Sequence, residues 1–220
     1  MIPIETHVYR GCLFLSLLCR LNAAADDLPQ GVINTQNPED ISLTPEVSLS
    51  RITVPEGFNV TLFAGEPDIR RPIAFDIDDR GRLWVVENYS HPNWDQDNKT
   101  DRIVILEDTN DDGRFNKRTI FWDQGRYLTG IALGQGGVWI ANTPDLAFIP
   151  DRDRDDVPDG DPVVKLDGFR VSSNNVVNNS HWGPDGWLYG AIGLGSVSLV
   201  ASPGSEPEHR TGITRGIWRY

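Results

Sequence analysis

The sequence predicts an all-β fold, an incomplete β-propeller of four-stranded blades. One short phrase occurs three times, at 71–87, 128–142 and 179–193, and each copy joins an apolar strand, a turn with Gly and a strand with an aromatic residue. These aromatic residues recur about every 50 residues, a period typical of propeller blades and not of helical solenoids. No helical periodicity of useful length is present. A β-sandwich is the alternative for evenly spaced short strands, and the repeat makes it the weaker one.

The expected strands follow one another in chain order from residue 51. The run at 58–67 alternates as a strand does, and the third blade stops after its third strand. A propeller ring needs at least four blades to close, so we expect the chain to be an N-terminal fragment. The expected strands are 73–78, 83–88, 102–108 and 117–122 in blade one, 129–134, 138–142, 146–151 and 162–169 in blade two, and 178–183, 187–193 and 216–220 in blade three.

The N-terminus is expected to be a signal peptide over residues 1–25. Arg10 precedes a short apolar run, and Ala23 to Ala25 offer a cleavage site. The run is too short to span a bilayer, so we expect export to the periplasm or the cell exterior, with no transmembrane segment after signal removal. Residues 26–50 are polar and predict a flexible linker, which leaves 51–220 as the partial propeller.

Cysteine content and charge exclude several kinds of site. Cys12 and Cys19 both lie in the expected signal peptide. The mature chain would therefore have no disulfide, no thiolate nucleophile, no Cys-ligated zinc and no haem attached through C-x-x-C-H. The formal net charge of −12 argues against a nucleic-acid partner, whose phosphates need Lys and Arg, and is compatible with cation binding.

Two acidic loops follow the expected third strands of blades one and two. Each places side-chain oxygens at alternate positions, with a backbone carbonyl at the seventh, as a hard cation such as Ca²⁺ requires. The flanking strands and the lack of Glu at position 12 argue against EF-hands, and Asp156 stands where Gly is expected. An Asp-rich turn without metal is the alternative. The expected calcium ligands are Asp108, Asn110, Asp112 and Asn116 in the first loop, and Asp151, Asp153, Asp155 and Asp159 in the second.

An antiparallel meander places these acidic loops at one end of the blades. The connections at the opposite end form the expected ligand mouth, where solvated loop residues without function are the alternative. His181, in a strand, is interpreted as structural. At the mouth, the acid–base candidates are Glu87, His91 and Arg126, and the candidates for substrate or cofactor binding are Asn142, Asn174 and Asn175.

Six phrases along the expected propeller match a known family: VPEGFNVTLFAGEP, GRLWVVENYSHP, RIVILEDTNDDGRFNKRTIF, TGIALGQGGVWIANTPDLAFIPDRDRDD, NNVVNNSHWGPDGWLYG and GIWRY. They resemble the planctomycete-type membrane-bound dehydrogenase N-terminal domain, a six-bladed propeller related to soluble glucose/sorbosone dehydrogenases. The resemblance covers about residues 51–220 and implies that about three of six blades are present.

The resemblance also implies a function. It points to a quinone-linked sugar or alcohol oxidoreductase scaffold, with pyrroloquinoline quinone as cofactor, a small sugar or polyol as ligand, and a cytochrome module in a longer protein. In the related sugar dehydrogenases a His before the G-P-D-G turn is the general base, but Asn174 and Asn175 occupy those positions here. An amide cannot accept a proton at neutral pH, so we expect no catalysis by this chain. The alternatives are a non-catalytic propeller that binds carbohydrate or protein, and a non-functional remnant.

Overall fold

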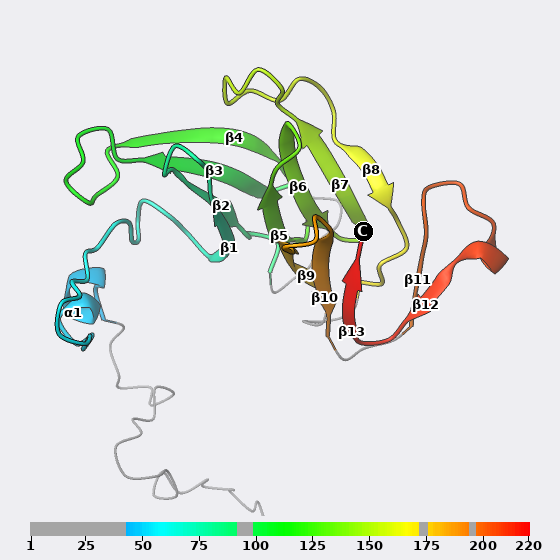
Figure 1. The fold of residues 1–220 in the computed structure, drawn as a ribbon, viewed down its shortest axis with the longest axis horizontal. Helices are drawn as coiled ribbons and strands as arrows, with labels where there is room; N and C mark the ends of the chain where they lie inside the picture. Colours follow the sequence, from blue (N-terminus) through cyan, green and yellow to red (C-terminus); the bar gives the residue numbers. More distant parts are fainter. Residues whose placement is uncertain (1–42, 92–98, 172–175, 194–196) are drawn as a thin grey trace, which may run out of the picture. The chain divides into compact units, whose positions relative to one another are not determined.

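The structure, a computed structural model, describes residues 43–91, 99–171, 176–193 and 197–220. The expected signal peptide and residues 26–42 of the expected linker lie outside these ranges. Residues Leu43–Tyr220 form one compact unit. Its described part contains one short helix, α1 (Pro45–Leu49), one 3₁₀ turn and thirteen strands, all paired in antiparallel sheets (Figure 1). The predicted all-β fold is confirmed.

Three of the sheets correspond to the three predicted blades. Each of the first two is a four-stranded meander in chain order, and the third pairs its strands in the order β13-β10-β9. Blade one contains β1 (Pro72–Ile77), β2 (Leu83–Glu87), β3 (Asp101–Glu107) and β4 (Lys117–Gly125); blade two contains β5 (Leu128–Leu133), β6 (Gly137–Asn142), β7 (Asp145–Pro150) and β8 (Val163–Leu166); blade three contains β9 (Val177–Trp182), β10 (Leu188–Ile192) and β13 (Gly216–Arg219).

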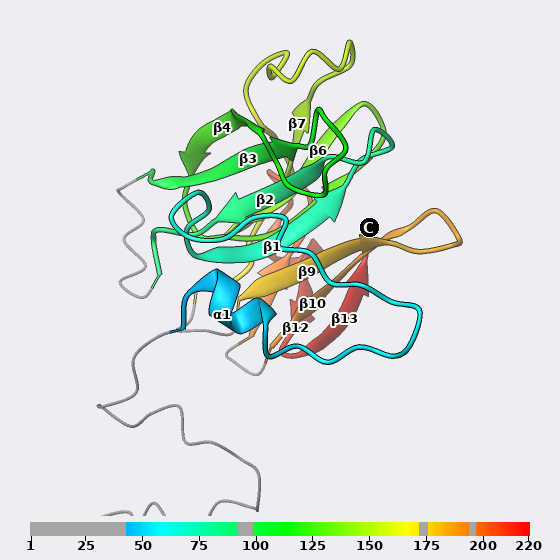
Figure 2. The same ribbon diagram turned by 90° about the vertical axis from the view of Figure 1, so that its left-hand side faces the viewer.

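The sheets are arranged as propeller blades are. Strand β5 contacts both β1 and β9, so the first strands of the three sheets are neighbours (Figures 1 and 2). The repeated aromatic residues Trp84, Trp139 and Tyr189 all lie in the second strand of their sheet, and each pairs with a residue of the first strand. The sequence repeat therefore marks equivalent positions in consecutive blades.

A carboxylate in the turn before the second strand fixes two of these aromatic side chains. Trp84 Nε1 donates to Asp78 at 3.0 Å, and the Tyr189 hydroxyl donates to Asp185 at 2.7 Å. Blade two has no acidic residue in the corresponding turn, and the buried Trp139 Nε1 has no hydrogen-bond partner among the described residues. The repeat thus carries a local polar contact that blade two lacks.

Two apolar layers join the blades. Trp84, Ile103 and Ile140 belong to the layer between blades one and two, and each buried side chain of this size stabilises the fold by about 1.5–3 kcal/mol. The second layer, between blades two and three, includes Trp218 of β13. Trp218 lies opposite Gly190, whose missing Cβ leaves room for the indole: a Cβ there would be 2.1 Å from the ring. The predicted apolar strand faces therefore form the core.

The N-terminal part differs from expectation in two places. Residues 45–49 form α1 instead of flexible linker, with Thr44 as N-cap. Residues 58–67 form no strand. Instead Phe63 and Ala64, together with Ile69, pack against the outer face of blade one. Packing an extended segment onto a sheet face produces the same alternation of apolar residues as pairing it at an edge, so the pattern could not separate them.

An insertion between β10 and β13 was not predicted. It contains the two-stranded sheet of β11 (Ser198–Val200) and β12 (Thr211–Ile213). Its strands have only three residues each, too short for periodicity to identify. The 3₁₀ turn Pro207–His209 lies between them.

A buried carboxylate joins blade one to blade two at the end opposite the acidic loops. Asp101, fully buried at the start of β3, accepts hydrogen bonds from the amides of Tyr89 and Ser90 at 2.7 Å each and from the Ser90 hydroxyl at 2.8 Å. It also accepts one from the amide of Leu128, the first residue of β5, at 3.0 Å. Asp101 therefore satisfies three backbone amides from two blades, which the sequence did not indicate.

Candidate functional site

The second acidic loop, between β7 and β8, brings three carboxylates together. One carboxylate oxygen from each of Asp151, Asp153 and Asp155 lies within 4.8 Å of the other two. Asp151 is only 6% exposed, and its Oδ1 has no hydrogen-bond partner among the described residues. A buried carboxylate oxygen without a partner is unfavourable unless a cation or a donor compensates it. The arrangement is therefore that of a site for a cation with oxygen ligands.

The electrostatics of this loop also favour a positive ion. Burial raises the pKa of Asp151, and the neighbouring carboxylates of Asp156 and Asp155 raise it further. The backbone amides of Arg154 and Asp155 donate to Asp151 and oppose this rise. A cation would remove the repulsion that raises the pKa, so metal and proton compete for Asp151.

Asp156, the residue in place of the expected Gly, has a different partner. Its φ is +70°, the left-handed conformation that Gly adopts most easily. Its carboxylate accepts two hydrogen bonds from the guanidinium of Arg82 on blade one, at 2.6 and 2.8 Å. Asp156 therefore keeps the turn and links the loop to the neighbouring blade. Arg154, with φ +63°, forms a second ion pair with Asp79 of blade one.

Asp159, the last predicted ligand of the second loop, is already engaged. Its Oδ2 accepts hydrogen bonds from the backbone amide of Arg152 at 2.8 Å and from the Arg152 guanidinium at 3.4 Å. It closes the loop by bonds within the chain, whereas Asp151, Asp153 and Asp155 form the carboxylate cluster.

The first acidic loop, between β3 and β4, also gathers its predicted ligands. Asn110 donates to Asp112 at 3.0 Å, and Asn116 donates to Asn110 at 2.9 Å. Burial alone would raise the pKa of Asp108, but the backbone amides of Gly113, Asn110 and Asp112 outweigh it and lower this pKa. Rotation of the Asn110 amide would present its oxygen in place of its nitrogen, so the set remains suited to a hard cation.

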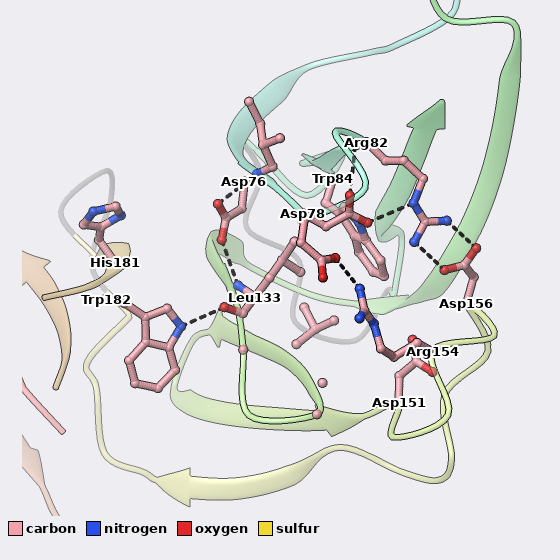
Figure 3. Close-up of a pocket in the computed structure, with 16 residues that line it drawn as sticks. Asp76, Asp78, Arg82, Trp84, Leu133, Asp151, Arg154, Asp156, His181 and Trp182 are labelled. Carbon is pink, nitrogen blue, oxygen red and sulfur yellow. Dashed lines mark hydrogen bonds and ion pairs between the residues drawn. The ribbon is translucent and has the colours of Figure 1, made fainter. Parts of the chain in front are cut away.

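A pocket of about 460 Å³ lies beside the second loop, where the β1–β2 and β5–β6 turns and the end of β9 meet (Figure 3). Leu133 connects its walls: its amide donates to Asp76 of blade one at 2.8 Å, and its carbonyl accepts from Trp182 of blade three at 2.8 Å. The pocket is lined by five carboxylates and two guanidiniums, so it is acidic overall. Its charged residues are Asp76, Asp78, Asp79, Asp151, Asp156, Arg82 and Arg154, and His181 lies at its rim.

The charged groups of blade one in this pocket are largely paired, either with one another or with the second acidic loop of blade two. Arg82 is 5% exposed and bridges Asp78, at 2.8 Å from its Nε, to Asp156. Its pKa is raised, first by the hydrogen bonds to Asp156. Burial would raise the pKa of Asp78, but hydrogen bonds from Trp84 and Arg82 lower it. These groups stay charged at neutral pH and determine the shape of the wall.

The candidates at the opposite end do not form one site with this pocket. Glu87 is fully buried and accepts hydrogen bonds from Arg118 at 3.0 Å and from the amide of Arg70 at 2.8 Å. The Asn142 side chain accepts from the Arg126 amide at 2.9 Å, and the amide of His91 donates to Asn88 at 2.9 Å. Asn174 and Asn175 lie outside the described residues.

Sequence reasoning did not identify Arg82 or the pocket. Arg82 follows a Gly turn, as many surface residues do, and its partner Asp156 is 74 residues further along the chain. A local pattern carries no information on such a pairing. Nothing in the sequence around Trp182, which follows His181, indicated that it lines a pocket.

Fold and site together define an all-β domain of consecutive antiparallel blades with acidic loops of the cation-binding type. Residues 44–220 match the family described as "Domain of unknown function (DUF7133)". The match spans most of the chain, and the protein therefore belongs to this family. Among the described residues, no helix is long and apolar enough to cross a membrane.

Comparison with curated proteins finds no match. Among solved structures, the chain is similar to the crystal structure of regucalcin, a calcium-binding protein from Agrobacterium tumefaciens strain C58. The TM-score is 0.41 and the sequence identity 14%; the alignment covers 64% of this chain and 43% of regucalcin. The chain thus spans less than half the length of that protein. At this level of similarity, the calcium of regucalcin does not transfer to this chain.

Proposed function

We propose that this domain is a calcium-binding β-propeller module of an exported protein. The observation that carries the proposal is the buried Oδ1 of Asp151, which has no hydrogen-bond partner among the described residues and belongs to the cluster with Asp153 and Asp155. All three ligands are carboxylates, which suit a hard cation, and neither acidic loop contains the Cys or His that zinc and copper prefer. Ca²⁺ accepts irregular geometry with six to eight oxygens more readily than Mg²⁺ does.

Calcium titration of the full chain tests this proposal. We expect saturable binding by calorimetry and a higher melting temperature, because a ligand that binds only the folded state stabilises it. An Asp108→Ala, Asp151→Ala double variant should lose both effects, and the two single variants separate the loops. An unchanged calcium response in the double variant would reject structural calcium.

A second candidate function is the oxidoreductase scaffold that the resemblance implies, binding a small sugar or polyol and serving a cytochrome module elsewhere. The observation that favours it is the exposed imidazole of His181 at the rim of the pocket, beside Trp182. A histidine can act as a general base near neutral pH. The acidic pocket opposes it, because pyrroloquinoline quinone carries three carboxylates of its own.

We expect no dye-linked oxidation of aldoses or polyols by the full chain, even with pyrroloquinoline quinone and calcium added. The measurement is dye reduction over time, with heat-denatured protein as the blank. Turnover that disappears on His181→Asn, His91→Asn or Glu87→Gln would contradict this expectation and identify the base. Sugar binding without turnover would instead support a non-catalytic carbohydrate-binding propeller.

A further inference from the structure

The loop with the carboxylate cluster makes three contacts with the β1–β2 turn of blade one. Arg82 holds Asp156 through two hydrogen bonds, at 2.6 and 2.8 Å. Arg154 pairs with Asp79, and Arg80 donates to the Arg154 carbonyl at 3.0 Å. These contacts join segments that are far apart in sequence and form the wall of the pocket shown in Figure 3.

The same short stretch of chain carries both sets of groups in alternation. Asp151, Asp153 and Asp155 form the carboxylate cluster, whereas Arg154 and Asp156 reach blade one. Arg154 and Asp156 both have a positive φ, which turns the backbone at each of them. The carboxylate cluster and the contacts to blade one therefore depend on one backbone conformation.

We propose that cation binding to the carboxylate cluster is coupled to the ion pairs between blades one and two, so that the cation fixes this wall of the pocket. The proposal rests on the cation site of the proposed function, and it adds that the ion pairs between the blades regulate cation binding at that site. Repulsion among the three carboxylates favours a wider loop. A cation would remove this repulsion and so stabilise the conformation seen here, in which Asp156 lies on Arg82. Coupling of this kind is reciprocal, so weaker ion pairs must weaken cation binding.

Arg82 carries most of this coupling. Its side chain is 5% exposed and that of Asp156 15%, and their contact is bidentate, which makes it strong and specific. Arg154 and Asp79 are 49% and 69% exposed, and an exposed ion pair contributes little. The test therefore concentrates on Arg82.

Arg82→Lys keeps the charge near the cation but cannot form the two parallel hydrogen bonds. Long-range electrostatics alone predicts unchanged calcium affinity, whereas coupling predicts affinity at least about fivefold weaker by calorimetry. Arg102→Lys is the matched control, since Arg102 pairs with Glu87 away from the loop, and its calcium affinity should equal that of the wild type. Equal affinity in wild type and Arg82→Lys would overturn the coupling.

Hydrogen–deuterium exchange of the wild-type full chain gives a second measurement that needs no variant. Coupling predicts that calcium slows amide exchange both in the loop at 151–161 and in the turn at 78–82. Protection of the loop alone would overturn the proposal. A wild-type chain that binds no calcium would instead refute the proposed function itself, so the two failures are distinguishable.

Discussion

Replacing Asp101 with Ala is expected to destabilise the protein by about 4 kcal/mol, the largest effect of any single substitution considered. The variant leaves the buried amides of Ser90 and Leu128, and the part-buried amide of Tyr89, without their acceptor. Each orphaned buried donor costs about 1–3 kcal/mol. Chemical denaturation monitored by tryptophan fluorescence measures the change in the free energy of unfolding.

Asp101→Asn is the matched control for this experiment. An amide oxygen can still accept the bonds from the backbone amides of Tyr89 and Ser90, which both reach Oδ1. Its NH₂ group cannot accept from the Leu128 amide or the Ser90 hydroxyl, which both reach Oδ2. We expect about half the loss found for Ala. A loss below about 1 kcal/mol in the Ala variant would show that other groups or water satisfy these amides.

The second large effect is a reversal of stability order at Asp151. In excess calcium, at about a hundredfold above Kd, the wild type should gain about 3 kcal/mol, or roughly 6–12 °C in Tm, whereas Asp151→Asn should gain little. In chelator the order should reverse, because the neutral amide removes a buried negative charge whose Oδ1 has no partner. Differential scanning fluorimetry in both buffers measures the two Tm values. Asp153→Asn, which changes an exposed carboxylate of the same cluster, is the control for the loss of a buried charge.

The pH dependence in chelator follows from the raised pKa of Asp151. The folded chain binds this proton more tightly than the unfolded chain does. The destabilisation that the buried Asp151 charge causes is therefore fully present above the pKa of Asp151 in the folded chain. It disappears as the pH falls through that pKa towards the usual value of 3.8. Asp151→Asn should lack this contribution. Identical pH profiles for the two proteins in chelator would contradict the assignment.

Glu87 shows how burial changes the interpretation of a residue. Near the end of a strand and beside a polar loop, it had the position of an acid–base group. In the structure it is fully buried and paired with Arg102 at 3.2 Å and Arg118 at 3.0 Å. The guanidiniums of Arg102 and Arg118 and the amide of Arg70 occupy the Glu87 carboxylate, so its role is structural. Its environment thus differs from that of Asp151, which is also buried but has an unpaired oxygen.

The sequence by itself determined the strands of the three blades, their order and the end of the blades at which each loop lies. These features are local: alternation of apolar residues, Gly turns and a repeat of about 50 residues each act over one hairpin. The carboxylates of Asp151, Asp153 and Asp155 were likewise predicted together, because neighbours on a short loop must lie close in space. Even the strand bounds depart from prediction by only a few residues.

Only the tertiary structure decided which distant side chains meet. The bond from Arg82 to Asp156, the burial of Asp101 and the packing of Phe63 onto blade one all join segments distant in sequence. Such contacts depend on how blades stack, and stacking is set by the summed burial of many side chains, not by any local pattern. The pocket lies at the end with the acidic loops for the same reason: the turns of neighbouring blades are brought together there by packing between sheets.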